Sequence, residues 1–358
     1  MRFLTGIFLA VLVCLSAAAW AQPAQQTPDQ SQEDRIKAQQ QRAVTQPGNN
    51  APVWREVREG QSPYTNSTVK GRETNVLVQS WGETWRQIRN GPVTFWGGWL
   101  VVLVLVAIAA FYFVFGPVKL HGRPTGRLIR RFSSLDQVLH WTVAISFSVL
   151  GLSGLLMLFG KHVVLPVFGY TLFAWLAALS KNLHNFVAPI FMVSVAIFAI
   201  LFVRYNLPRA YDLAWFRHAL GYVTGKEHVP SGKFNGGEKV WFWGGVVVLS
   251  IVVSWSGLIL LFPNFDQTRA VMQQAWIWHA SAAVLYIAIS FGHIYLGTAG
   301  VEGAYQAMRT GYVDEIWAKE HHEYWFNEMK SRGAAAAGGA AAASGAIPAG
   351  APHMKEKS

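Results

Sequence analysis

The chain has 358 residues, of which 52% are hydrophobic and 14% charged, and its formal net charge is +11. Soluble domains contain about 25% charged residues, so this composition, with a mean hydropathy of +0.24, predicts a membrane protein. The single cysteine, Cys14, lies in an N-terminal targeting segment. A mature chain without it has no thiol for iron–sulfur ligation, disulfides, thiol catalysis or covalent c-type haem attachment.

Residues 1–21 have the features of a secretory signal peptide. Arg2 precedes an apolar run, and Ala-Trp-Ala at 19–21 fits the small-residue pattern of a cleavage site. The alternative is a lipoprotein anchor on Cys14, which is disfavoured because Val13 stands where such sites need a small residue. We therefore expect the mature N-terminus in the periplasm.

Two segments outside the apolar stretches are polar or of low complexity. Residues 22–92 are rich in Gln, Pro, Asn and Thr, and we expect a periplasmic arm that is partly disordered. Its second half, residues 53–90, holds four aromatic residues and either orders against a partner or stays flexible. Residues 331–358 contain an Ala- and Gly-rich run and are expected to form a cytoplasmic tail.

Five stretches are long and apolar enough to cross a hydrocarbon core of about 30 Å: residues 93–116, 138–160, 183–203, 240–262 and 274–298. Basic residues concentrate in the linkers 117–137 and 204–239, whereas the opposing linkers offer only Lys161, Lys181 and Arg269. The positive-inside rule thus agrees with the signal peptide. We expect a multi-pass protein of the bacterial inner membrane with its C-terminus in the cytoplasm.

Residues 162–180 also lack Asp, Glu, Lys and Arg and could cross the membrane on length alone. Pro166, Gly169 and the flanking lysines favour a periplasmic turn or a segment that lies on the bilayer. A crossing here would reverse the charge asymmetry of the second basic linker.

Four histidines lie in the predicted spans, where polar groups are costly and usually functional: His140, His184, His279 and His293. The last two share one span at a spacing of 14, which advances about 21 Å and leaves both on nearly the same face. The topology places His184 at the depth of His279, and His140 at the depth of His293. Two bis-imidazole pairs in a helix bundle are what two b-type haems require, although a lone histidine is as often a hydrogen-bonded helix contact.

Zinc or copper would gather three or four ligands at one depth, whereas a haem needs only two axial ligands. A bis-imidazole haem transfers electrons and leaves no position for substrate, so we expect no catalytic residue in this chain. Gly151, Gly154 and Gly292 could leave room for a macrocycle, although helix packing explains each equally well. The other histidines, including His321 and His322, are expected to be solvated or to face lipid headgroups, unless one lies near a quinone pocket.

The second basic linker ends in Ser-Gly-Lys-Phe-Asn-Gly-Gly-Glu-Lys at residues 231–239, at the depth of His140 and His293. An Asn-Gly-Gly turn exposes backbone N–H groups, and the Asn235 amide could donate to a quinone carbonyl. From these residues alone, a plain turn at the membrane surface before the next helix is the stronger interpretation.

Several fragments between residues 130 and 330 are similar to one known family. They are Arg131-Phe132, Leu139-His140-Trp141, Asn182-Leu183-His184, Gly232–Lys239, Trp241–Trp243, Ile277–Ala280, Gly292–Tyr295 and Trp317–His322 with Tyr324-Trp325. Together they resemble the gamma, or cytochrome b, subunit of membrane-bound respiratory formate dehydrogenase. The resemblance implies an iron–sulfur beta subunit on the periplasmic face, a molybdenum- or tungsten-dependent catalytic alpha subunit that oxidises formate, and quinone reduction on the cytoplasmic side.

The resemblance also implies roles for individual residues. His184 and His279 would bind the iron of the periplasmic haem b, His140 and His293 that of the cytoplasmic haem b, and Asn235, Gly237 and His293 would bind the quinone. The expected fold is an all-α integral membrane protein: a four-helix di-haem bundle within 130–330 plus one additional N-terminal transmembrane helix. The signal peptide, the arm and the extra helix depart from the simplest family pattern. No nucleic-acid partner is expected, and association of the complex into a higher oligomer stays open.

Other functions use similar features. A cytochrome b subunit of a membrane-bound hydrogenase, or a free-standing two-haem cytochrome b, would need the same histidine pairs, and the metals of co-purifying partners would distinguish them. A haem-free assembly anchor would show no b-type absorption bands. A transporter would need charged groups at the membrane midplane, and the middles of these spans carry none.

Overall fold

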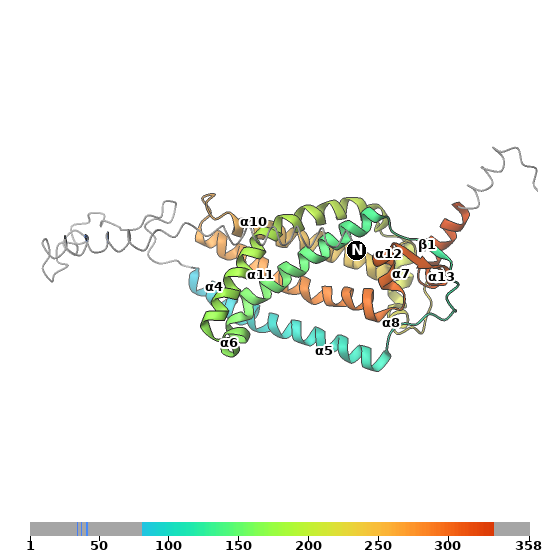
Figure 1. The fold of residues 1–358 in the computed structure, drawn as a ribbon, viewed down its shortest axis with the longest axis horizontal. Coiled ribbons are helices and arrows are strands. Elements are labelled where there is room, and N and C mark those ends of the chain that lie inside the picture. The colour runs from blue at the N-terminus through green and yellow to red at the C-terminus, as the bar shows by residue number, and fades with distance from the viewer. Residues whose placement is uncertain (1–33, 35–36, 38–40, 42–80, 333–358) are drawn as a thin grey trace, which may run out of the picture. The chain divides into compact units, whose positions relative to one another are not determined.

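The computed structural model describes residues 81–332 together with Asp34, Lys37 and Gln41. The predicted signal peptide at 1–21, nearly all of the arm before residue 81 and the tail from residue 333 lie outside the described residues. The chain divides into two units, Met1–Val78 and Gln79–Ser358. The elements below belong to the second unit (Figure 1).

Four helices of the described part are long and apolar enough to cross a membrane: Gly82–Phe115, Ser134–Tyr205, Gly236–Leu261 and Arg269–Gly300. Three predicted spans each fall in one of these helices. Spans 93–116 and 240–262 extend one residue beyond the helix end, and span 274–298 lies entirely within Arg269–Gly300. The other two, 138–160 and 183–203, share the second helix. The chain is therefore a multi-pass membrane protein whose described part is almost entirely helical.

The first of these helices consists of α4 (Gly82–Ile88), the π-helix η1 (Arg89–Trp96) and α5 (Gly97–Phe115). It begins well before residue 93, so the end of the expected arm is helical. Pro92 lies in η1, where its missing N–H and the wider π-turn interrupt the regular ladder. No residue of α5 is buried, and Phe113 is 85% exposed. Such a continuous apolar surface suits contact with lipid.

The longest helix is α6 (Ser134–Phe202), with 69 residues. It begins at a capping box in which the Ser133 hydroxyl accepts from the Asp136 N–H at 3.2 Å, while the Asp136 carboxylate accepts from the Ser133 N–H at 2.8 Å. A straight helix of this length would extend about 100 Å, roughly three times the hydrocarbon thickness. α6 must therefore bend.

Contacts between its N-terminal and C-terminal halves show that α6 is a helical hairpin. The Ser153 hydroxyl lies 3.0 Å from His184 Nδ1, and the rings of Phe147 and Phe191 are 6.0 Å apart. The reversal occurs at Gly169, with φ 74° and ψ 176°, in a region of backbone conformation that only glycine adopts readily. Figure 1 shows the two arms diverging from this bend. The turn expected within 162–180 is thus a one-residue break between two helical arms.

The remaining elements are mostly short helices, apart from α10 and α11. They are η2 (Val203–Tyr205), α7 (Ala210–Arg217), α8 (Ala219–Val223), α9 (Gly236–Trp241), η3 (Phe242–Leu249), α10 (Ser250–Leu261), α11 (Arg269–Tyr295), η4 (Leu296–Gly300), α12 (Ala304–Thr310), α13 (Glu315–His321) and a helix over 323–332. Strand β1 (Leu128–Arg130) pairs antiparallel with β2 (Tyr312–Asp314), with Ile129 opposite Val313. Apart from this two-stranded sheet, the named elements of the described part are helices, as the all-α prediction expects.

One hydrophobic core joins the long helices to the cap, a name we use for β1, β2, α12, α13 and the helix at 323–332. The core runs from Phe191 and Tyr286 in the bundle to Trp317 and Trp325 in the cap, and α11 packs against both α10 and α5. Arg131, at 7% exposure, contacts the cap through Trp317 of α13.

The Arg131 guanidinium holds the cap to the turn at 231–239. It donates to the Lys233 carbonyl at 2.8 Å and to Glu238 at 3.1 Å, and it lies 4.9 Å from the centre of the Trp317 ring. A buried cation needs such partners, because burial without them is strongly unfavourable.

Gly169→Ala should destabilise the hairpin by about 1–3 kcal/mol, because alanine must adopt a backbone conformation that is nearly exclusive to glycine. No atom lies within 4 Å of an added Cβ there, so the cost comes from the backbone alone. Thermal unfolding in detergent, followed by circular dichroism, measures it. Gly244→Ala is the control, since its Cβ also meets no atom within 4 Å and its φ is not positive. Equal melting temperatures for the two variants would contradict the assignment of the bend.

Candidate functional site

The four membrane histidines lie in two pairs, as the sequence predicts. The ring centroids of His184 and His279 are 5.9 Å apart, and those of His140 and His293 are 6.3 Å apart. Each pair takes one member from α6 and one from α11. His184 and His140 come from opposite arms of the hairpin, so the two pairs lie at different levels of α11, separated by about 21 Å.

The spacing within each pair suits two axial ligands of one metal ion. Two imidazole nitrogens bound at about 2.0–2.1 Å on opposite sides of an ion place their ring centroids about 6 Å apart. Both measured separations agree with this value. Within residues 81–332, no three His, Cys, Asp or Glu side chains gather closely enough to hold a metal ion by themselves. A metal ion held by only two histidines needs another group to supply its remaining ligands.

The tautomer of His279 follows from its hydrogen bonds. Its Nδ1 lies 3.0 Å from the Val253 carbonyl oxygen, which can only accept, so Nδ1 carries the proton. The Ser256 hydroxyl lies 3.3 Å from the same nitrogen and donates to the Val252 carbonyl at 2.5 Å. The lone pair of His279 is therefore on Nε2, the arrangement of most metal-binding histidines.

His184 is oriented in the same way from the opposite arm of α6. Its Nδ1 lies 3.0 Å from the Ser153 hydroxyl, whose own hydrogen goes to the Val149 carbonyl at 2.7 Å. The imidazole is therefore the donor, and its Nε2 also keeps the lone pair. Both histidines of this pair are thus fixed by contacts outside the pair.

Two glycines lie directly against these imidazoles. A Cβ on Gly154 would come within 3.4 Å of His184 Cε1, and a Cβ on Gly257 within 3.2 Å of His279 Cε1. Gly154 was among the glycines predicted to leave room for a macrocycle. Gly151 instead faces Ile287, and a Cβ on Gly292 would meet no atom within 4 Å. Of the three, Gly154 thus packs against an imidazole, and room for a macrocycle at these glycines stays a prediction.

The second pair has different surroundings. His140 Nδ1 is buried and has no hydrogen-bond partner within the described residues. Trp241 stacks on His293, with ring centroids 4.7 Å apart and an interplanar angle of 10°. Trp141 meets His140 edge-on at 5.4 Å, and its indole N–H donates to the Met308 carbonyl at 3.1 Å. Aromatic packing, rather than hydrogen bonding, therefore orients this pair.

The turn at 231–239 connects to the second pair through α9. Asn235 is the N-cap of α9: its Oδ1 accepts from the Glu238 N–H at 2.9 Å, and Glu238 accepts from the Asn235 N–H at 2.8 Å. Because Oδ1 is occupied, the Asn235 NH₂ is the group left for another partner. Trp241, at the end of α9, stacks on His293. Gly237 has a packing role, since a Cβ there would lie 2.6 Å from the Trp215 ring.

A buried ion pair fixes α9 to α7. The Lys239 ammonium donates to both carboxylate oxygens of Asp212 at 2.8 Å, and their side chains are 7% and 9% exposed. Lys239 therefore neutralises a buried partner, although the sequence presents it as one more basic residue of a linker.

His321 and His322 are not solvated, contrary to the prediction: they are 4% and 2% exposed. His321 Nδ1 lies 3.1 Å from the Tyr222 hydroxyl, and His322 Nδ1 donates to the Gly232 carbonyl at 2.8 Å. The apolar core of the cap buries both, and this long-range packing between α8, α13 and the turn is not visible in a local polar sequence.

Ser153, Ser256 and Gly257 were missed by the sequence analysis, although a signal was present. The sequence Ser-Gly-Leu occurs at 153–155 and again at 256–258, in two different spans. In each copy the serine lies within hydrogen-bond distance of an imidazole Nδ1, and the glycine packs against the same ring. A repeat search would have singled out these two segments.

Comparison with known proteins gives a family match over residues 131–311, to the prokaryotic cytochrome b561 family. The chain is 32% identical over 208 residues to the formate dehydrogenase cytochrome b556(fdo) subunit of Escherichia coli, which covers 56% of this chain and 93% of that protein. It is 29% identical over 209 residues to the nitrate-inducible formate dehydrogenase cytochrome b556 subunit of the same species, with 57% and 93% covered. The formate dehydrogenase cytochrome b556 subunit of Haemophilus influenzae is 25% identical over 211 residues, with 56% and 83% covered.

Lys239→Met should reduce the free energy of unfolding by about 3–5 kcal/mol, because it leaves the Asp212 carboxylate buried without its counter-ion. Thermal unfolding in detergent measures the loss. Lys330→Met is the control: the Lys330 side chain is 69% exposed and 3.7 Å from Glu315, so its removal should cost at most about 1 kcal/mol. A Lys239→Met protein as stable as the control would show that the pair contributes little.

Proposed function

This chain belongs to the prokaryotic cytochrome b561 family, and from this premise we propose that it is the membrane-anchoring di-haem cytochrome b subunit of a formate dehydrogenase. In this proposal it passes electrons from a periplasmic iron–sulfur subunit to quinone on the cytoplasmic side. Formate is oxidised by a molybdenum- or tungsten-dependent partner subunit. The observation that carries the proposal is the two bis-imidazole pairs at separate levels of one helix bundle.

Family membership implies haem b, and the residues of this chain fit it. His184 and His279 would bind one iron through Nε2, and His140 and His293 a second. Three observations support this assignment: centroid separations near 6 Å, Nδ1–H groups engaged elsewhere in the first pair, and Gly154 and Gly257 packed against the imidazoles. A b haem with two imidazole ligands supplies single-electron transfer and offers no coordination site to substrate.

The unequal hydrogen bonding of the two pairs favours one direction of transfer. An Nδ1–H that donates to oxygen gives the imidazole more anionic character, which stabilises oxidised iron and lowers the reduction potential. His184 and His279 both have such a bond, whereas His140 Nδ1 has no partner within the described residues. Electrons would therefore pass downhill from the His184–His279 level to the His140–His293 level.

The quinone would bind at the His140–His293 level, beside the turn at 231–239. Asn235 has an NH₂ group available for a quinone carbonyl, and His293 is joined to the same helix by its stack on Trp241. We keep Gly237 in the proposed pocket for its backbone N–H, although its packing against Trp215 explains the glycine without a ligand.

Orientation completes the proposal. The two arms of α6 would each cross the bilayer, giving five crossings with α5, α9–α10 and α11. The basic linkers and the cap would face the cytoplasm, and the mature N-terminus the periplasm. The extra helix α5 would be the crossing outside the four-helix haem bundle, packed on α11.

His279→Ala should lower the haem b content of the purified complex from two to one per chain and stop formate-dependent quinone reduction. Formate oxidation with an artificial dye should persist, because that reaction occurs in the partner subunits. Pyridine haemochrome analysis measures the content. His162→Ala, which alters an exposed histidine of α6, should keep both haems. A colourless wild-type protein, or one haem with all four histidines intact, would overturn the proposal.

Ser153→Ala should raise the midpoint potential of one haem by about 30–60 mV, a threefold to tenfold change in the ratio of oxidised to reduced iron. The reason is that His184 Nδ1–H loses its acceptor, so oxidised iron is less stabilised. Redox titration of the b-type absorption bands measures the shift. Ser148→Ala removes an exposed hydroxyl that bonds only to the Ala144 carbonyl and should leave both potentials unchanged. A fall in potential for Ser153→Ala would contradict the direction of transfer argued above.

A further inference from the structure

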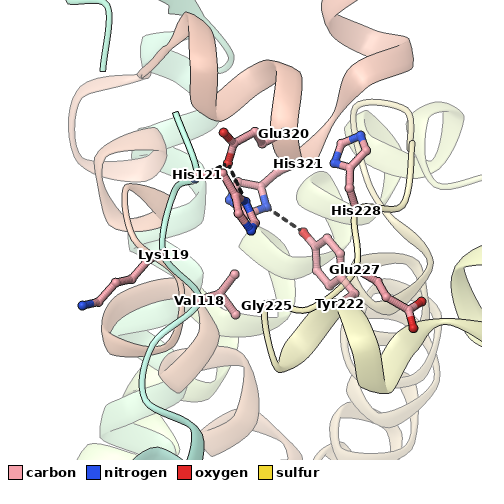
Figure 2. Close-up of a pocket in the computed structure, with 9 residues that line it drawn as sticks. All are labelled: Val118, Lys119, His121, Tyr222, Gly225, Glu227, His228, Glu320 and His321. Carbon is pink, nitrogen blue, oxygen red and sulfur yellow. Dashed lines mark hydrogen bonds and ion pairs between the residues drawn. The ribbon is translucent and has the colours of Figure 1, made fainter. Parts of the chain in front are cut away.

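A small pocket lies where α13 of the cap meets α8 and the linker after α5, separate from the proposed quinone turn (Figure 2). Its volume is about 20 Å³, enough for one water molecule. Its lining residues are Val118, Lys119, His121, Tyr222, Gly225, Glu227, His228, Glu320 and His321. The pocket therefore combines ionisable surface groups with a buried histidine and a buried tyrosine.

His321 Nε2 is the group that points to a ligand here. The His321 side chain is 4% exposed, yet its Nε2 atom has no hydrogen-bond partner within the described residues. A buried polar nitrogen left unpaired is costly. Because this nitrogen belongs to a residue that lines a water-sized pocket, a water molecule is the partner that the geometry can supply.

The other nitrogen of His321 leads toward the quinone turn. His321 Nδ1 lies 3.1 Å from the Tyr222 hydroxyl, as Figure 2 shows. Burial raises the pKa of Tyr222 far above its usual range. The Tyr222 ring lies 5.5 Å from the Trp215 ring, which packs against Gly236 and Gly237 of the turn.

The turn is tied to α13, so this arrangement is fixed. The Ser231 hydroxyl donates to the His321 carbonyl at 2.8 Å, and His322 Nδ1 donates to the Gly232 carbonyl at 2.8 Å. The His321 and Trp317 rings are 5.0 Å apart. These contacts hold the His321 ring between the pocket and the turn.

Two histidine–glutamate pairs connect the pocket to solvent. His121 lies 3.5 Å from Glu320 with its side chain 71% exposed, and His228 lies 3.0 Å from Glu323. Titratable or charged groups near His321 are His121, Glu320, His228, Glu227, Lys119 and Arg131. Burial lowers the pKa of His321 to about 4, so it is neutral at pH 7. A neutral imidazole can accept a proton on one nitrogen and release one from the other.

We propose that His321 and Tyr222 form the proton-uptake path of the quinone site, with the pocket as its solvent end. This inference rests on the proposed function, in which each quinone takes two electrons from the haems and two protons from the cytoplasm to become a quinol. For each proton, a pocket water protonates His321 Nε2, the Nδ1 proton passes to the Tyr222 oxygen, and the tyrosine hydroxyl proton moves to the quinone beside Asn235. Each passage leaves the His321 proton on Nε2 instead of Nδ1, so the imidazole ring turns over and the tyrosine hydroxyl rotates back before the second proton follows by the same steps.

The test uses the whole formate dehydrogenase complex in detergent, with formate as donor and a short-chain quinone analogue as acceptor. Tyr222→Phe keeps the ring that packs against Trp215 at 5.5 Å but removes the hydroxyl. His321→Asn keeps a group that can bond to Tyr222 but cannot pass a proton through a ring. Tyr312→Phe, a half-exposed tyrosine of β2, is the matched control.

Both test variants should lower kcat for quinone reduction at least about tenfold, with KM for the quinone retained and a larger solvent deuterium isotope effect. Reduction of the haems by formate, followed in the absence of quinone by stopped-flow spectroscopy, should keep its wild-type rate. The control should match wild type in every measurement.

The outcomes separate this path from the proposed function. If Tyr222→Phe has the wild-type kcat and isotope effect, the path is overturned. A raised KM with kcat retained also overturns it, because that result indicates a structural role only. If His321→Asn fails to assemble, its haem content shows this, and Tyr222→Phe decides alone. A wild-type complex whose haems are reduced by formate but which does not reduce the quinone overturns the proposed function itself.

Discussion

The structure depends on one constraint: four imidazoles from two helical elements must meet in two pairs within an apolar bundle. Each pair joins α6 to α11, and α6 can serve both levels only because it reverses at Gly169. Polar side chains in such surroundings are costly unless they are satisfied. The serine and carbonyl partners of one pair and the tryptophan stack on the other show two different ways of placing an imidazole in this environment.

Much of the bundle was predictable because its signals are local. Uncharged runs of sufficient length identify α5, α9–α10 and α11, and a spacing of 14 puts His279 and His293 on one face. The pairing of His184 with His279 required only the expected order of crossings. The sequence analysis divided α6 into two spans at nearly the right place, since Pro166 and Gly169 mark the reversal, but it did not anticipate that the segment around them is helical.

Other features were hidden because they depend on contacts between distant segments. Arg131 and Lys239 look like solvated positive charges in a linker, yet each is buried against an acidic partner and, for Arg131, aromatic rings. His321 and His322 look like surface residues for the same reason. The prediction that Gly237 serves the quinone has a competing structural explanation in Trp215. Composition gives the number of charged residues, whereas the fold determines which of them are exposed to solvent.

The division of ligands between α6 and α11 also has a consequence for biogenesis. Both arms of α6 emerge from the ribosome early and can associate as a hairpin, because their contacts are close in sequence. Neither imidazole pair is complete at that stage, since each needs a histidine from α11, the last long apolar helix of the described chain. In the proposed di-haem protein, binding of both haems would therefore depend on the insertion of α11. A chain that stalls before residue 269 would offer only one axial ligand at each level.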